Sequence, residues 1–162
     1  MPTQSAYQVR FEWGAPGVDS VGDGADAVIW VDQLPATPRD VPDFPTVVAG
    51  SIQNRRAVAA WVIDEQARVG DRFTVAVIAA GEAREDGSLR FAVEDLLGAG
   101  AVIDALAEVG IDYCSPEAAA ACAAFTSLSK AAAHLISASE SGMATGRPML
   151  DLDAIDEVPR LR

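Results

Sequence analysis

Hydrophobic and polar residues alternate near the start of the chain, and short apolar runs follow. Apolar side chains fall at every second position from Tyr7 to Trp13, which predicts a strand with one face toward water. Residues 27–31 form a continuous apolar run closed by Asp32, as expected for a strand buried on both faces. Residues 46–49 and 73–80 predict a third and a fourth strand.

Apolar residues recur at helical spacing in the rest of the chain. Residues 52–68 lie between the third and fourth strands, so these two strands are expected to be parallel, with a right-handed crossover. Residues 92–108 carry an apolar stripe that stops before a glycine. Ser115, followed by proline and glutamate, is typical of a helix start. The helix that it opens is expected to end near Thr126, and a second helix to span 127–140.

Three segments predict connections, and the tail predicts an edge strand. Residues 19–26 are rich in glycine and aspartate and indicate a loop or a weak helix. Residues 33–45 contain four prolines, which exclude a helix interior or a central strand and favour an extended connection. Residues 81–90 read as a charged loop. The tail, 149–162, alternates apolar residues with acids and is expected to add a last edge strand before Pro159.

The order of these elements predicts a single α/β domain over residues 1–162, with an open, mostly parallel sheet and flanking helices. Half of the residues are hydrophobic, which excludes a disordered chain. No apolar run reaches the roughly 18 residues of a membrane helix. The N-terminus lacks the charged-then-apolar layout of a signal peptide. We therefore expect a cytoplasmic protein without a membrane partner.

Charge and rare residues narrow the function further. The net charge of −12 argues against nucleic acid as a partner, because phosphate backbones would be repelled. Cys114 and Cys122 are expected to be buried or idle thiols in a reducing compartment. His134, the only histidine, is expected to be a surface or packing residue. The sequence contains no Ser-His-Asp set, metal-type cysteine pair or glycine-rich nucleotide loop.

Polar residues follow two of the predicted strands, at the edge where parallel sheets bind ligands. Asp32 is either the cap of a turn or a ligand of a divalent cation such as Mg²⁺. Ser51 leads into a helix whose first turn contains Asn54, and free backbone N–H groups there favour an anion. The same pattern is also typical of an ordinary helix cap.

Acidic residues follow the fourth strand and open the next helix. Glu82 lies in the charged loop, and Glu94 and Asp95 fall in the first turn of the helix after it. Acids in a first turn are commonly partners of the helix dipole. The alternative interpretation places Glu94 or Asp95 beside Asp32, over the ligand-binding edge of the sheet.

Five segments, in the same order along the chain, resemble the 2-phosphosulfolactate phosphatase family, known as ComB. The first is residues 81–100, which contain the pair Glu94-Asp95 followed by Ala-Gly. The other four are residues 7–14, 27–34, 51–59 and the C-terminal segments 139–142 with 152–159. The resemblance spans nearly the whole chain.

The resemblance implies Mg²⁺-dependent hydrolysis of a phosphate ester of a small sulfonated acid, on a reduced version of the larger ComB-like fold. We assign catalysis and the metal to Asp32, Glu94 and Asp95. We assign the phosphate and the rest of the substrate to Ser51, Asn54, Glu82 and Arg39. In these roles the cation would neutralise developing charge and orient water.

The chain also departs from the family, whose members are considerably longer. A proline-rich bridge, residues 35–45, stands where the family has an arginine-containing helix start and further strand–helix units. Arg39 is our candidate substitute for the lost arginine. Because the deletion removes strands, it is expected to leave apolar edges that a second copy covers, giving a homodimer.

Three functions stay open. The preferred one is a pared-down Mg²⁺-dependent phosphatase. The alternative is a non-catalytic ComB-like domain with a structural or binding role, its activity lost with the deleted segment. Generic binding of a nucleotide or acid sugar is less favoured, because no phosphate loop is present.

Overall fold

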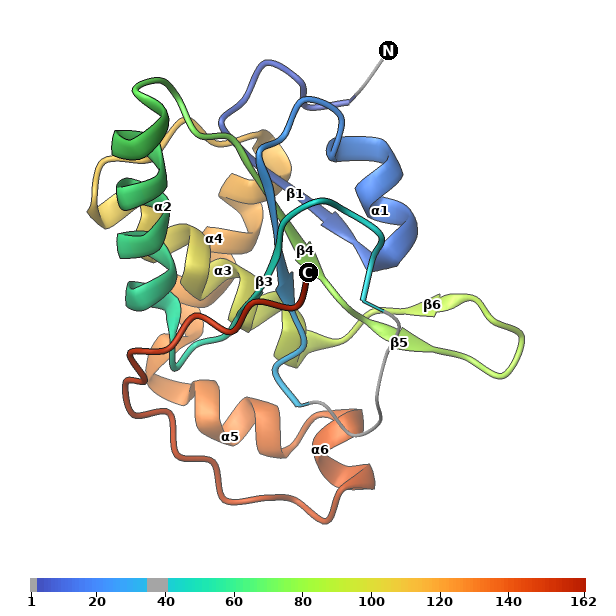
Figure 1. The fold of residues 1–162 in the computed structure, drawn as a ribbon. Coiled ribbons are helices and arrows are strands. Elements are labelled where there is room, and N and C mark those ends of the chain that lie inside the picture. The colour runs from blue at the N-terminus through green and yellow to red at the C-terminus, as the bar shows by residue number, and fades with distance from the viewer. Residues whose placement is uncertain (1–2, 35–40) are drawn as a thin grey trace.

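Four short parallel strands form the central sheet of the computed structural model, which describes residues 3–34 and 41–162 (Figure 1). The strands lie in the order β1-β4-β2-β3. They are β1 (Val9–Trp13), β2 (Ala27–Val31), β3 (Val47–Gly50) and β4 (Val75–Ala79). The predicted α/β class and parallel sheet are confirmed. The third and fourth strands are parallel, as expected, but they are not neighbours, because β2 lies between β3 and β4.

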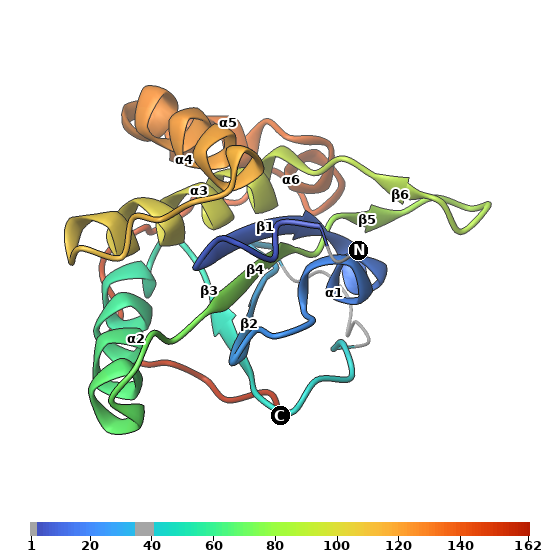
Figure 2. The same cartoon turned by 90° about the horizontal axis from the view of Figure 1, so that it is seen from above.

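Helices cover both faces of the sheet (Figure 2). Alternate residues of the strands point to opposite faces, so each face has its own core. The smaller core is closed by α1 (Gly14–Val21). The larger core is closed by α2 (Arg55–Val69), α3 (Val93–Glu108) and α4 (Pro116–Leu128). The predicted bounds of α3 agree with the structure to within a residue.

The first strand does not have the predicted face toward water. Helix α1 starts directly after β1 and covers its polar side, where the sequence indicated only a later loop or weak helix. Arg10 is therefore 3% exposed. Its guanidinium donates hydrogen bonds to four backbone oxygens, those of Ser5, Tyr7, Val21 and Asp23, over 2.7 to 3.1 Å. Burial lowers the pKa of Arg10, and the nearby carboxylates of Asp23 and Asp26 partly oppose that effect.

Both edges of the sheet are covered by other parts of the same chain. At β1, the side-chain amide of Gln4 accepts from Phe11 N and donates to Phe11 O, each over 2.9 Å, as a neighbouring strand would. At β3, Leu161 N donates to Val47 O over 2.7 Å. The open edges that suggested a homodimer are therefore absent from the described part of the chain, and the homodimer stays a prediction.

The tail was predicted to add a strand before Pro159, and that prediction is wrong. Residues 149–158 form no strand, and the tail instead meets β3 at one antiparallel bridge, between Val48 and Arg160, and through backbone hydrogen bonds of Val47 and Ala49 with residues 159–162. Proline has no backbone N–H for a ladder, so regular pairing could not extend through it.

The segment after α4 is broken into short helices. A 3-10 turn, η1 (Ser129–Ala131), separates α4 from α5 (Ala132–Ser137) and α6 (Glu140–Ala144), where a single helix over residues 127–140 was expected. By length and mean hydropathy (1.2), the stretch Pro116–Ala144 meets the criterion for a membrane span, with 22% of its window buried. Much of that hydropathy comes from alanine. Two of its large apolar residues, Phe125 and Ile136, pack in a core cluster with α3, whereas Leu128 and Met143 are exposed.

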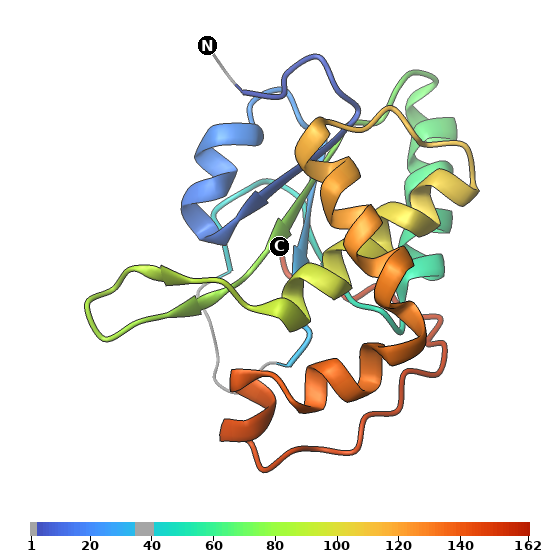
Figure 3. The ribbon, with the colours of Figure 1, turned by 180° about the vertical axis from the view of Figure 1, so that it is seen from behind.

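The predicted charged loop after β4 is a hairpin that projects from the body of the molecule (Figure 3). Its strands are β5 (Glu82–Ala83) and β6 (Leu89–Arg90), paired antiparallel. The hairpin begins directly at the carboxyl end of β4, so its first residue, Glu82, stays close to the sheet.

Candidate functional site

The carboxyl ends of β2, β3 and β4 open on the same edge of the parallel sheet. Asp32 directly follows β2 and is half-buried. Glu82 is also half-buried and follows β4 by three residues. The first turn of α3 carries Glu94 and Asp95, both 1% exposed. Four of the predicted site residues are thus placed around the end of the sheet.

Asp95 joins the ends of two strands. Its Oδ1 accepts a hydrogen bond from Gln33 N over 2.8 Å, and its Oδ2 accepts one from Gly81 N over 2.9 Å. Gln33 follows Asp32, and Gly81 precedes Glu82. A carboxylate that takes one backbone donor on each oxygen is well suited to hold two chain segments in place.

Glu94 is different, because it is buried without being fully bonded. No hydrogen bond reaches its Oε2 from the described residues. A buried carboxylate oxygen without a donor is costly, on the order of 1–3 kcal/mol, and in native proteins such a group calls for an explanation, such as a catalytic role or a bound water or ion. Glu94 is therefore the strongest functional candidate at this edge.

The predicted phosphate-binding pair, Ser51 and Asn54, is used by the fold. Asn54 Oδ1 accepts from Ser51 N over 2.8 Å and from Ser51 Oγ over 3.1 Å. Its Nδ2 donates to Ala49 O over 2.9 Å and to Glu157 O over 3.0 Å. Asn54 is 5% exposed. In the described chain the pair forms the corner between β3 and α2 and fastens the tail to it.

The tail also covers the start of α2, where the sequence predicted an anion site. Ile155 N donates to Gln53 O over 3.0 Å, and Gln53 Nε2 donates to Asp151 O over 3.2 Å. Helix α2 begins at Arg55, three residues later than expected. Backbone oxygens of an acidic tail therefore lie where a phosphate was predicted, which weakens the electrostatic case for that subsite.

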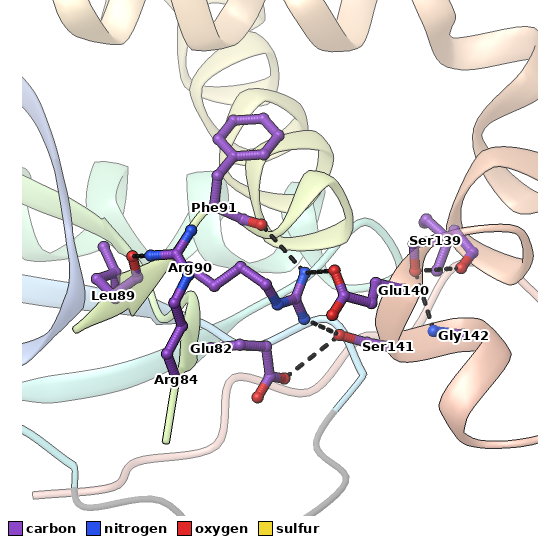
Figure 4. A network of polar contacts seen from close by, with 10 residues as sticks. Glu82, Arg84, Leu89, Arg90, Phe91, Ser139, Glu140, Ser141 and Gly142 are labelled. Atoms are coloured by element: carbon purple, nitrogen blue, oxygen red, sulfur yellow. Dashed lines mark hydrogen bonds and ion pairs between the residues drawn. The ribbon is translucent and has the colours of Figure 1, made fainter. Parts of the chain in front are cut away.

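Glu82 belongs to a polar network between the hairpin and α6 (Figure 4). Ser141 Oγ donates to Glu82 Oε1 over 3.4 Å and accepts from Arg90 Nη2 over 3.0 Å. Arg90 Nη1 also forms an ion pair with Glu140 Oε2 over 3.4 Å. Arg90 and Ser141 were not predicted as site residues, because nothing in the sequence shows that residues 51 positions apart meet here.

Among the residues that the structure describes, two cavities adjoin Glu82. One, of about 230 Å³, is lined by the network residues Glu82, Arg90, Glu140 and Ser141, and by Thr145 and two alanines. The other, of about 410 Å³, has mostly apolar walls that include Trp30 and Leu89. A small acid fits the dimensions of either cavity, and only the first offers a cationic side chain.

The three carboxylates predicted to bind a metal do not form a metal cluster. Among residues 3–34 and 41–162, no group of three or more His, Cys, Asp or Glu side chains is arranged to hold a metal ion. Mg²⁺ does not require such a group, since it commonly takes one or two carboxylates together with oxygens of water and substrate. The unbonded oxygen of Glu94 fits a cation held in that way. Arg39, the remaining predicted site residue, lies outside the described residues.

The cysteines lie away from this edge. The backbone of Cys114 forms a parallel β-bridge with Val9, the first residue of β1, at the opposite end of the sheet. Both cysteines are free and half-buried, as expected for idle thiols, and His134 is exposed.

We expect Cys114 to react slowly with alkylating reagents. Burial raises the pKa of its thiol from 9.0 to about 11, and Cys122 and Asp112 add to the effect. Because the thiolate is the nucleophile, carbamidomethylation at pH 8 should be about 100-fold slower than in the unfolded chain. The rate should continue to rise with pH beyond 9. Peptide mass spectrometry across a pH series measures it, and a plateau below pH 9 would contradict the assignment.

One family comparison bears on this site. A sequence model of the family described as 2-phosphosulpholactate phosphatase matches residues 24–153, which include the end of β2, the hairpin and the first turn of α3. No curated protein matches the chain.

Proposed function

The chain belongs to the 2-phosphosulpholactate phosphatase family, and on that premise we propose that it is a Mg²⁺-dependent phosphatase acting on the phosphate ester of a small acid. The observation that carries the proposal is Glu94. Its carboxylate is buried at the ligand-binding edge of a parallel sheet, and Oε2 has no hydrogen-bond partner among the described residues. A bound cation would complete its contacts.

In this proposal each residue has a limited role. Glu94 and Asp32 hold the cation together with oxygens of the substrate. When bound, Mg²⁺ supplies positive charge against the phosphate oxygens and lowers the pKa of water. Arg90, beside Glu82 and Ser141, faces a cavity of about 230 Å³ and offers its guanidinium to the acidic group of the substrate.

The direct test is phosphate release from 2-phosphosulfolactate. We expect turnover with millimolar Mg²⁺ and a loss of at least roughly 100-fold in excess EDTA, because the carboxylates alone cannot neutralise the substrate. A simple phosphate ester without a second acid group should be a poorer substrate. A rate that EDTA leaves unchanged would contradict the metal, and a rate indistinguishable from buffer would contradict the enzyme.

A non-catalytic, binding or structural role is the alternative, and one observation favours it. Ser51 and Asn54 are engaged within the fold, and the tail covers the start of α2, which weakens the case for a phosphate subsite there. Under this alternative the protein shows no turnover, and millimolar Mg²⁺ leaves its melting temperature unchanged. A ligand that binds the folded state has to raise that temperature.

A further inference from the structure

Gln33, Gly81 and Asp95 form one hydrogen-bonded group at the sheet edge. Each of them is the sequence neighbour of a carboxylate residue of the candidate site. Asp32 precedes Gln33, whose backbone N–H donates to Asp95. Glu82 follows Gly81, whose backbone N–H donates to the other oxygen of Asp95. Glu94 precedes Asp95 itself. A single side chain therefore connects the three segments that carry these carboxylates.

The connection is tight and buried. The two bonds measure 2.8 and 2.9 Å, and Asp95 is 1% exposed, so water does not compete for its oxygens. The ends of β2 and β4 are also joined directly, since Ala80 N donates to Val31 O over 2.8 Å. Beyond the ends of these strands, Asp95 connects Gln33 and Gly81, the residues at which the chain turns away to form the site.

The side chain of Gln33 extends the group to the third strand. Its Oε1 accepts from Ile52 N over 2.9 Å, and its Nε2 donates to Gln53 Oε1 over 2.8 Å. Gly98, one turn after Asp95 on α3, permits the close approach. A Cβ there would lie 2.7 Å from a methyl of Val31 and 2.9 Å from Gln33 Oε1. The start of α3 is thus seated directly on the ends of β2, β3 and β4.

We propose that Asp95 is a positioning residue that sets the relative placement of Asp32, Glu82 and Glu94, and does not itself bind the cation or the substrate. The structural role of Asp95 is inferred from the two hydrogen bonds alone. The expected effect on turnover rests in addition on the proposed function. It reassigns Asp95, which the sequence placed at the metal. Misplacing reacting groups by about 1 Å commonly lowers a rate by about 100-fold, so the placement is of functional importance.

The test combines hydrogen exchange with kinetics in the full-length chain. In the wild type, the amides of Gln33 and Gly81 should exchange as slowly as those inside β2 and β4. Asp95→Asn keeps the shape of the side chain, but its amide nitrogen faces one of the two N–H donors, so one bond is lost. We expect the exchange of at least one of these amides to accelerate by about 10-fold or more relative to amides inside β2 and β4, and kcat to fall by about 30- to 100-fold while KM changes by less than about 3-fold.

Leu106→Ala is the matched control, because Leu106 is fully buried on the last turns of α3, away from the edge. It should lower the melting temperature at least as much as Asp95→Asn, yet accelerate the exchange of Gln33 and Gly81 no more than that of amides inside β2 and β4, and leave kcat within about 3-fold of wild type. Faster exchange in Asp95→Asn with kcat unchanged would overturn the positioning role. If both amides exchange fast in the wild type, the two hydrogen bonds to Asp95 do not hold these segments, and the proposal is overturned without any variant. A wild type without turnover would contradict the proposed function instead. Slow exchange that depends on Asp95 would then still show that Asp95 holds the two segments in place.

Discussion

Replacing Glu94 by glutamine is expected to lower phosphate release by about 100- to 1000-fold, which corresponds to about 3–4 kcal/mol of lost transition-state stabilisation. The substitution keeps the size of the side chain and removes its charge. If Glu94 holds a cation through the oxygen that lacks a donor, the neutral amide binds that cation far more weakly. The measurement is kcat/KM for 2-phosphosulfolactate over a range of Mg²⁺ concentrations.

Glu108→Gln is the control for this experiment. Glu108 ends the same helix, is exposed, and makes one loose ion pair with Arg56 over 3.9 Å. It should retain full turnover, because surface charges far from the site contribute little. Equal losses in the two variants would show that the charge of α3, and not the carboxylate at the edge, controls the rate.

Replacing Arg10 by methionine is expected to destabilise the protein by about 3–5 kcal/mol. Methionine fills the space under α1, but it leaves four backbone oxygens without the guanidinium that binds them. Two of them, those of Val21 and Asp23, lie at the end of α1, where helix carbonyls need donors. Denaturant unfolding of the two proteins measures the difference.

The matched substitution is Arg56→Met, at an exposed position on α2. It should change the free energy of unfolding by less than about 0.5 kcal/mol. An Arg10 variant that is as stable as the wild type would show that water reaches these oxygens and that the buried arginine is dispensable.

Local signals predicted the elements well. The apolar run 27–31 is a strand buried along its whole length. Ser115 caps α4 as its sequence indicated, accepting from Ala118 N over 3.1 Å with proline at the first helical position. These features depend on neighbours within a few residues, which the sequence displays directly.

Features that depend on distant segments were not visible. The alternation in β1 indicated water on its polar face, but α1 folds over that face and Arg10 becomes a buried link. The sequence around Ser51 and Asn54 indicated an anion site, because the tail residue that bonds to Asn54 lies about 100 positions later in the chain. Hydropathy patterns cannot distinguish a surface that faces water from one that a remote segment covers.

The candidate site was predicted in its residues more than in their roles. Asp32, Glu82, Glu94 and Asp95 follow strands whose ends meet at the edge, so the order of elements along the chain was sufficient to predict that they lie there. Distinguishing Glu94 from Asp95 required the contacts. One has both oxygens bonded to backbone donors, and the other has an oxygen without a donor among the residues described.

The central claim is that the carboxylate of Glu94 is maintained for a ligand and not for the fold, and the free energy of unfolding of Glu94→Gln without ligand tests it most directly. We predict a variant as stable as the wild type, or more stable by about 1 kcal/mol, because an amide is less costly to bury than a carboxylate with an unbonded oxygen. A variant less stable by about 2 kcal/mol or more would assign Glu94 to the architecture of the protein and would contradict the account.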